Sequence, residues 1–189
     1  MINLLFILAI AMFCCYKIYS DRKWHQKPIQ NFPFYHKGKV FWYSRSVATT
    51  IGVFCLNAEN KWCVLANKRG RGVPDYKGYW NIVCGYLEHG ITGEENCQKE
   101  VYEECGVFIP CDKIRFYSVS TSPSQNKQNV IIKYITQLEG TCDEYDITNE
   151  YCDEDEVDDV KWIPVEEIGE YKWAFNHKEV IQEMFKKII

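Results

Sequence analysis

Three glutamates, Glu100, Glu103 and Glu104, lie within about one helical turn of each other in this sequence. On a helix, positions i, i+3 and i+4 share one face. Three carboxylates on one face repel one another, so the helix is destabilised unless a cation lies between them. Hard divalent cations such as Mg²⁺ take oxygen ligands of this kind. The spacing therefore fits a metal site, although a solvated acidic helix face gives the same pattern.

The residues around the glutamates favour a helix with one buried side. The helical pattern covers residues 93–105, and Gly106 follows at the position where glycine commonly ends a helix. Val101, Cys97 and Cys105 lie on the side of that helix opposite the carboxylates. The pattern predicts that this apolar side packs on a core while the acidic side faces a ligand or solvent.

Apolar and β-branched runs before and after this helix indicate strands. The runs are residues 47–56, 61–66, 79–84, 114–120, 129–138 and 160–165. A Gly/Pro-rich basic loop at 68–78 and an acidic loop at 139–159 separate some of them. An amphipathic run at 178–188 predicts a second helix. Strands on both sides of a central helix, with another helix at the end, predict an α+β sandwich with a mixed sheet.

The segment from residue 84 to residue 107 resembles the Nudix box, G-x5-E-x7-R-E-U-x-E-E-x-G-U, in which U is a bulky aliphatic residue. The positions that match in type and spacing are Gly85, Glu100, Val101, Glu103, Glu104, Gly106 and Val107. The resemblance implies a Nudix-like α/β/α sandwich over residues 39–189, with Mg²⁺ or Mn²⁺ held by Glu100, Glu103 and Glu104. It also implies hydrolysis of a nucleoside diphosphate linked to another moiety, so the expected partner is a small nucleotide-derived diphosphate.

Two positions of the box depart from the family pattern. The first box glutamate falls on Ile91, which offers no oxygen to a metal, and the box arginine falls on Lys99. Lysine supplies the positive charge but lacks the planar, two-pronged hydrogen bonding of arginine. In addition, Cys84 stands where the family usually has glycine, and Glu88 lies three residues before Ile91. The alternative function is therefore a Nudix-fold protein that binds or senses a nucleotide without hydrolysing it.

Charged residues outside the box are further candidates. Lys68, Arg69 and Arg71 lie in the Gly-rich loop, where they could contact substrate phosphates or only solvent. Glutamates in the late acidic loop of many Nudix hydrolases serve as general base or extra metal ligand. By its spacing from Trp162, Glu156 is the candidate for that role, and an acidic surface loop is the alternative.

Aromatic and histidine residues are weaker candidates for ligand binding. Trp80, Tyr134 and Phe175 could stack on a nucleotide base, but aromatic residues in strands more often belong to the core. For His89 and His177, which are isolated in the sequence, a surface or packing role is the expectation rather than metal binding.

The first sixteen residues are nearly all apolar. Extended to residue 19, the segment is just long enough for a membrane-spanning helix. The basic residues follow this segment, which places the domain after it in the cytoplasm. They are Lys17, Arg22, Lys23 and Lys27. We expect a membrane anchor at 1–19 and a linker at 20–38. A cleaved signal peptide and a buried hydrophobic helix in a cytoplasmic protein are the alternatives.

Length and net charge limit the number of domains and the kinds of binding partner. The chain has 189 residues, which fits one ordinary domain with a short appendage. A net charge of −4 argues against binding to a nucleic acid polymer, which needs a basic surface. The ten cysteines form no Cys-x-x-Cys pair, so we expect reduced thiols. The sequence leaves the oligomeric state open, including a homodimer.

Overall fold

The computed structural model describes residues 32–122, 129–153 and 155–189, and the chain divides into two compact units, Met1–Ser44 and Arg45–Ile189. The helix predicted at the N-terminus lies outside the described residues. Within the part of the chain that is described, no helix has the length and apolar character needed to cross a membrane.

The described part of the first unit is a β-hairpin. Strand β1 (Phe32–His36) pairs antiparallel with β2 (Lys39–Tyr43). The turn between them places Lys37 and Gly38 at φ 47° and 79°, as two-residue hairpin turns require. Residues 32–38 of the expected linker at 20–38 belong to this hairpin. The sequence did not predict it, because Lys-Gly is a weak turn signal and Pro33 argues against a strand.

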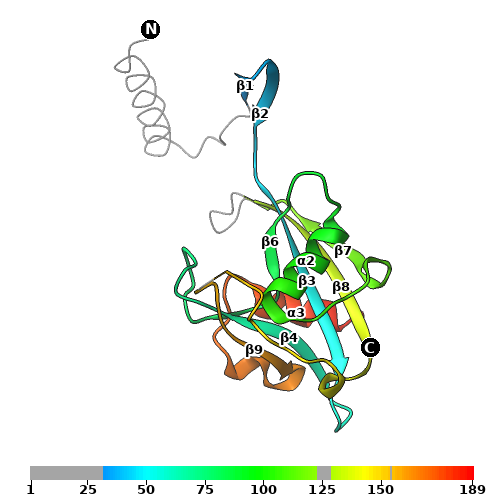
Figure 1. The fold of residues 1–189 in the computed structure, drawn as a ribbon. Helices are drawn as coiled ribbons and strands as arrows, with labels where there is room; N and C mark the ends of the chain where they lie inside the picture. The colour runs from blue at the N-terminus through cyan, green and yellow to red at the C-terminus, as the bar shows by residue number, and fades with distance from the viewer. Residues whose placement is uncertain (1–31, 123–128, 154) are drawn as a thin grey trace. The chain divides into compact units, whose positions relative to one another are not determined.

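The second unit is built on a mixed sheet (Figure 1). Its central strand, β3 (Val47–Leu56), pairs parallel with β8 (Val130–Thr141) and antiparallel with β4 (Trp62–Arg69). The shorter strands are β5 (Trp80–Asn81), β6 (Cys84–Tyr86), β7 (Arg115–Ser120) and β9 (Val157–Pro164). The order along the sheet is β5-β4-β3-β8-β7, with β6 paired to β3 and β9 paired to β4.

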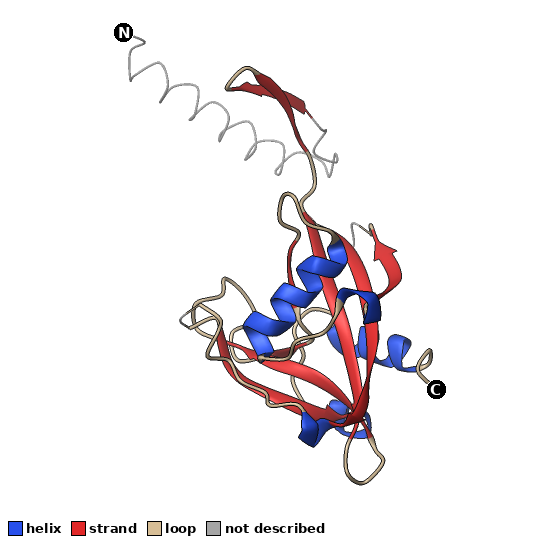
Figure 2. Ribbon diagram, turned by 45° about the vertical axis from the view of Figure 1, so that its right-hand side comes forward, coloured by secondary structure: helices blue, strands red, loops and turns tan. Residues whose placement is uncertain are grey.

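Helices cover both faces of this sheet (Figure 2). Successive strand residues point to opposite faces, so Val53 of β3 packs in one core with α2 (Gly93–Cys105) and Phe54 packs in the other with α3 (His177–Phe185). Short 3-10 helices occur at Cys111–Lys113, Cys142–Glu144 and Val165–Glu170. The predicted α/β/α sandwich with a mixed sheet is confirmed.

Several strand boundaries differ from the sequence-based prediction. The predicted strand 79–84 is two short strands, because Trp80 and Asn81 pair with β4 whereas Cys84–Tyr86 pair with β3. Strands β8 and β9 extend into the predicted acidic loop. The cause is a long-range pairing that local pattern does not reveal: β9 lies along β4, up to the partners Arg69 and Val157.

The predicted helix at 93–105 is α2, residue for residue. Thr92 begins it with a capping box, in which the Glu95 amide donates to the Thr92 hydroxyl at 3.2 Å and the Thr92 amide donates to the Glu95 carboxylate at 2.7 Å. Gly106 ends the helix in the left-handed conformation, at φ 76°, and its amide donates to the Tyr102 carbonyl at 2.9 Å.

Replacement of Gly106 tests this helix end. A Cβ atom at this position would lie 2.6 Å from Cγ2 of Thr148, and a left-handed conformation costs a non-glycine residue about 1–2 kcal/mol. We therefore expect Gly106→Ala to lower the free energy of unfolding by at least that amount, measured by urea titration. The control is Gly169→Ala, where the nearest atom is 4.0 Å away. An equal effect of the two substitutions would contradict the assignment.

Candidate active site

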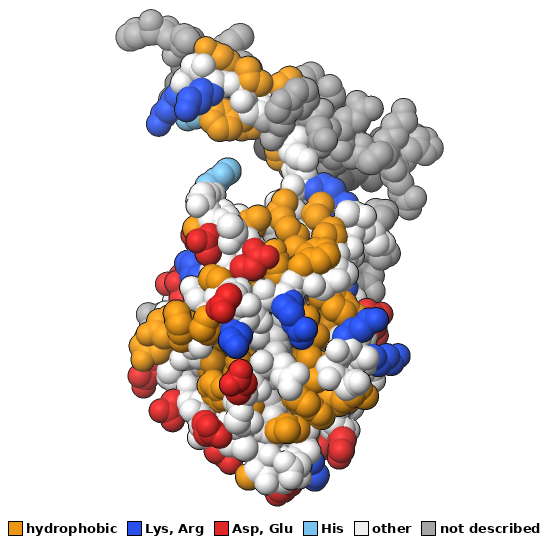
Figure 3. Space-filling model, turned by 90° about the vertical axis from the view of Figure 1, so that its right-hand side faces the viewer, with side chains coloured by type: hydrophobic (Ala, Val, Ile, Leu, Met, Phe, Trp, Pro, Cys, Tyr) orange, Lys and Arg blue, Asp and Glu red, His pale blue; other side chains and the backbone are white. Residues whose placement is uncertain are grey.

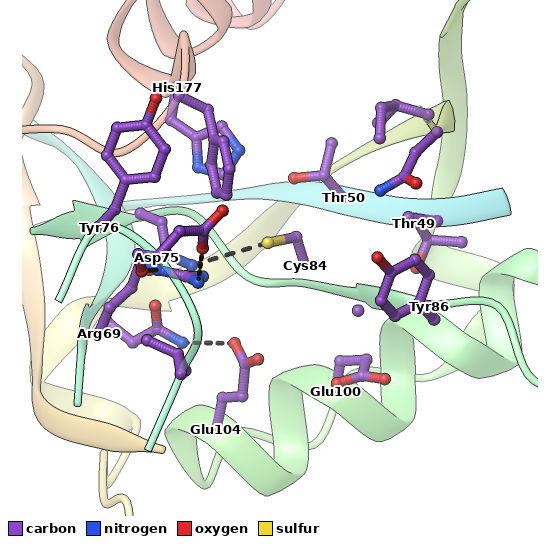
Figure 4. Close-up of a pocket in the computed structure, with 18 of the residues that line it drawn as sticks. Thr49, Thr50, Arg69, Asp75, Tyr76, Cys84, Tyr86, Glu100, Glu104 and His177 are labelled. Atoms are coloured by element: carbon purple, nitrogen blue, oxygen red, sulfur yellow. Dashed lines mark hydrogen bonds and ion pairs between the residues drawn. The ribbon is translucent and has the colours of Figure 1, made fainter. Parts of the chain in front are cut away.

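A pocket of about 670 Å³ opens beside α2 and collects residues that are far apart in the sequence. Its walls come from β3, β4, β6, α2, the loop at 73–76 and the start of α3 (Figure 4). Ligand pockets in proteins typically measure about 300–1,000 Å³, so this one has room for a nucleotide-sized molecule.

Two of the three predicted metal ligands, Glu100 and Glu104, line this pocket from α2 (Figure 4). Glu103 does not line it. Its carboxylate accepts a hydrogen bond from Lys99 Nζ at 2.8 Å. Each helical residue turns by 100°, so Glu103 lies over Lys99 on one side of the acidic face. The spacing alone had grouped all three glutamates.

Gly85, the first glycine of the box, allows β6 to pack closely against Glu100 of α2. A Cβ atom at Gly85 would collide with the carboxyl group of Glu100. The loop that follows is fixed to α2 and β3 through Asn96, whose Oδ1 accepts from the Glu88 amide at 3.2 Å and whose Nδ2 donates to the Thr49 hydroxyl at 2.9 Å. The box thus brings the strand, the loop and the helix together at the carboxylates.

The pocket concentrates negative charge in a buried place. Burial raises the pKa of Glu104 well above its ordinary value, and the charges of Glu100 and Glu156 raise it further. Asn67 Nδ2 donates a hydrogen bond to Oε2 of Glu104, which partly offsets this effect. Burial also raises the pKa of Glu100 to about 7, against the opposing charge of Lys99.

The side chains present fit a divalent cation that a ligand helps to hold. Among the described residues, no three His, Cys, Asp or Glu side chains are close enough to bind a metal ion by themselves. Mg²⁺, however, is usually bound by one or two carboxylates together with substrate phosphates and water. Two pocket amides, Asn67 and Asn81, have buried Oδ1 atoms without a hydrogen-bond partner in the described structure. A hydrated cation would supply the missing donors.

Lys99, which stands at the box arginine, joins several carboxylates. Its Nζ lies 3.2 Å from Glu88 Oε1, 2.8 Å from Glu103 Oε2 and 4.0 Å from Glu100 Oε1. These contacts make Lys99 a positioning residue for the acidic face of α2. Glu88 is more than half exposed, and neither it nor Ile91 belongs to the pocket walls, so Glu88 does not take the place of the missing box glutamate.

Of the three basic candidates, only Arg69 lines the pocket. It donates from Nε to the Asp75 carbonyl at 3.0 Å and from Nη2 to the Asp75 carboxylate at 2.6 Å. Its guanidinium also lies 5.2 Å from the centre of the Phe175 ring. Arg71 is exposed and pairs with Asp155 at 2.8 Å, and Lys68 alternates with Arg69 along β4 and so points to the other face.

Glu156 lines the pocket, and the Gly-rich loop holds its backbone in place. The Gly70 amide donates to the Glu156 carbonyl and the Gly72 amide to the Asp155 carbonyl, each at 2.7 Å. A Cβ atom at Gly70 would collide with that same Asp155 carbonyl. The loop therefore positions Glu156 through its glycines, a role that the basic residues of the loop did not suggest.

Aromatic residues form the wall across from the carboxylates. Phe175 and Tyr76 pack with ring centres 4.7 Å apart, and both have left-handed backbone conformations, with φ 52° and 49°. Non-glycine residues in this conformation cluster at functional sites. Trp80 and Tyr134 are buried core residues instead. The pocket also contains the buried His177, the first residue of α3, for which the sequence indicated only a surface or packing role.

The protein is thus an α/β/α sandwich with an acidic pocket beside the glutamate-bearing helix α2. Comparison with known families gives the same class: residues 47–184 match the family model described as NUDIX domain. The chain belongs to the Nudix family and has a Nudix-type hydrolase domain.

Solved structures with the same fold are distant in sequence. The NUDIX domain of Shewanella oneidensis NrtR, complexed with ADP ribose, has 16% identity and a TM-score of 0.63, over 78% of this chain and 90% of that one. A MutT/nudix family protein from Enterococcus faecalis has 19% identity and a TM-score of 0.62, over 94% and 68%. A bifunctional NMN adenylyltransferase/ADP ribose pyrophosphatase from Francisella tularensis, complexed with AMP and Mn ion, has 18% identity and a TM-score of 0.59, over 91% and 46%.

The buried carboxylates predict an unusual dependence of stability on pH. In the unfolded chain a glutamate titrates near about 4.3, whereas burial raises the pKa of Glu100 to about 7 and that of Glu104 well above its ordinary value. Between these values the folded state binds more protons, so the free energy of unfolding falls as pH rises. We expect this fall between pH 5 and 8 in chelator-treated protein, measured by urea titration at each pH.

Substitution of single glutamates shows how much of this pH dependence comes from the buried carboxylates. Glu104→Gln removes one of the two groups and should make the fall smaller, whereas Glu183→Gln, on the exposed side of α3, should leave it unchanged. A wild-type stability that is constant or rises over this range, or an equal slope in Glu104→Gln, would contradict the electrostatic description.

Proposed function

We propose that this domain hydrolyses the diphosphate bond of a nucleoside diphosphate linked to another moiety, with Mg²⁺ or Mn²⁺ as cofactor. The observation that carries the proposal is the meeting of Glu100, Glu104 and Glu156 in one pocket that also contains Arg69. The complexes of related proteins with ADP ribose, and with AMP and Mn ion, support the substrate class and the metal.

The charged and aromatic pocket residues have distinct roles in this reaction. Glu100 and Glu104 would hold the cation together with the substrate phosphates. When bound, such an ion neutralises the charge of the diphosphate and lowers the pKa of water. Arg69 adds positive charge to the wall beside Asp75, and the rings of Phe175 and Tyr76 offer a stacking surface for a nucleoside base.

Glu156 serves as the general base. The oxygen of a water molecule attacks one phosphorus, the bond from that phosphorus to the bridging oxygen breaks, and Glu156 accepts the proton of the water. The products are a nucleotide and a second phosphate compound. A base must lie within reach of the attacking water, and the hydrogen bonds from Gly70 and Gly72 fix the backbone around Glu156 for this purpose.

The rival function is nucleotide binding without hydrolysis. The observation that favours it is the incomplete box: Ile91 supplies no ligand, and Glu88 pairs with Lys99 outside the pocket. A binding protein would keep the pocket, the aromatic wall and the affinity for a nucleoside diphosphate derivative. It would lack turnover, so the two functions are distinguished by product formation.

Hydrolysis of a panel of nucleoside diphosphate derivatives, with Mg²⁺ or Mn²⁺, tests the proposal. We expect turnover by the wild type and a loss of about 100-fold or more in Glu104→Gln, because loss of even an outer-shell partner of a metal ligand costs about 10–100-fold. Glu103→Gln, outside the pocket, should lose less, and the exposed Glu183→Gln should match the wild type. Equal turnover by Glu104→Gln and an active wild type would refute the mechanism.

Restoring the missing box residue separates the two functions. Ile91→Glu restores the carboxylate that the family pattern has at this box position, and we expect it to raise turnover about tenfold or more. Calorimetric titration with the best panel compound then measures binding independently. A wild type that binds this compound without turnover, beside an active Ile91→Glu variant, would establish the binding function in place of hydrolysis.

We also propose that residues 1–19 tether the chain to a membrane with the domain in the cytoplasm. The apolar run and the basic residues after it support this proposal. Cell fractionation of the full chain should place it in the membrane pellet, with the domain accessible to protease only from the cytoplasmic side. Complete recovery in the soluble fraction would contradict the tether. A homodimer stays a prediction, and the molecular mass of the purified protein in solution would test it.

A further inference from the structure

The β1–β2 hairpin exposes an unusual amount of apolar surface. Five of its large side chains have exposed fractions between 39% and 74%. They are Phe34, Tyr35, Val40, Phe41 and Tyr43. Within the described chain, β1 and β2 pair only with each other. A two-stranded hairpin is marginally stable by itself in water, so a surface of this kind indicates a partner that covers it.

Both faces of the hairpin carry this apolar surface. Phe34 and Phe41 are cross-strand partners whose rings stack with centres 5.6 Å apart. Tyr35 and Val40 form the next cross-strand pair, and neighbouring pairs point to opposite faces of a sheet. A protein groove would cover one face, whereas insertion into a soft interface covers both.

The charge of the hairpin region is entirely positive. Residues 22–44, which end the first unit, contain five lysines and arginines and no aspartate or glutamate, although the whole chain has a net charge of −4. Lys37 lies in the turn of the hairpin and Lys39 begins β2, so basic side chains stand at the tip beside the aromatic ones (Figure 3). The partner that complements this surface is anionic.

We propose that the β1–β2 hairpin binds the surface of an anionic phospholipid bilayer. Aromatic side chains are favoured at the membrane–water interface, and lysines near the surface are attracted to anionic headgroups. The hairpin also follows closely in sequence on the apolar run at 1–16, which fits the same partner. This surface is separate from the proposed hydrolase site, and its binding depends on lipid charge and salt, which a spanning segment does not require.

Vesicle binding by the full-length chain tests this proposal. Vesicles of phosphatidylcholine alone are compared with vesicles that also contain phosphatidylserine, at low and high salt. We expect at least about tenfold tighter binding to the phosphatidylserine vesicles at low salt, since each lysine near an anionic surface contributes several-fold. High salt, or the double variant Lys37→Glu/Lys39→Glu, should remove this preference. The control Lys186→Glu/Lys187→Glu reverses two exposed lysines of the other unit and should keep it.

Hydrogen exchange gives a second measurement that works even when residues 1–19 hold the chain on both kinds of vesicle. Peptides covering residues 32–43 should exchange more slowly on phosphatidylserine vesicles than on phosphatidylcholine vesicles, and the double variant Tyr35→Ser/Phe41→Ser should lose this protection. Equal exchange on both vesicles would overturn the hairpin proposal, while charge-independent membrane binding would leave the tether proposal intact.

A competing partner class gives a different outcome. Basic grooves with aromatic residues also bind single-stranded nucleic acid. A single-stranded RNA oligonucleotide that binds the wild type, fails to bind Lys37→Glu/Lys39→Glu and displaces the hairpin from vesicles would overturn the lipid assignment. Absence of such competition, together with the phosphatidylserine preference, would support it.

Discussion

The carboxylate of Glu104 is the group around which the site is organised. It is buried at the wall of the pocket, accepts a hydrogen bond from Asn67, and is repelled by the charges of Glu100 and Glu156. Burying a charge without a paired cation is costly, and the raised pKa of Glu104 is a direct expression of that cost. A divalent cation bound between these carboxylates would offset their mutual repulsion. The carboxylates that make the pocket acidic are therefore the same groups to which we assign the proposed cation.

The two cores on either side of the sheet keep this strained arrangement in place. Val101 and Cys97 fix α2 against β3, so Glu100 and Glu104 cannot turn away into solvent. On the other face, Met184 packs against Phe54 and anchors α3, whose first turn carries His177 into the pocket. Backbone hydrogen bonds between the Gly70–Gly72 segment and the loop before β9 add Glu156. Stability thus resides in the apolar layers, while the unfavourable electrostatics are confined to the site.

The features that follow from local spacing could be predicted from the sequence. Periodicity and the terminal glycine located α2 to the residue, and the family resemblance pointed to the wall that carries Glu100 and Glu104. The separation of Glu103 from the other two glutamates was not predicted, because grouping the three glutamates left out Lys99, which stands four residues before Glu103 and pairs with it. Asn67 and His177 were not predicted as pocket residues. They line the pocket because β4 and α3 pack there, and local sequence patterns do not reveal such long-range packing. The hairpin at residues 32–43 was missed because its turn and strand signals are weak.

In the proposed mechanism, the face formed by Glu100 and Glu104 binds a divalent cation together with a diphosphate ligand. The most direct test is titration of Mn²⁺ into wild type and Glu104→Gln, in the presence of a non-hydrolysable nucleoside diphosphate analogue, followed by electron paramagnetic resonance of the free ion. We expect wild type to take up Mn²⁺ much more tightly with the analogue than without it, and Glu104→Gln to lose this gain while still unfolding cooperatively. Equal Mn²⁺ uptake by the two proteins, with and without the analogue, would contradict this mechanism.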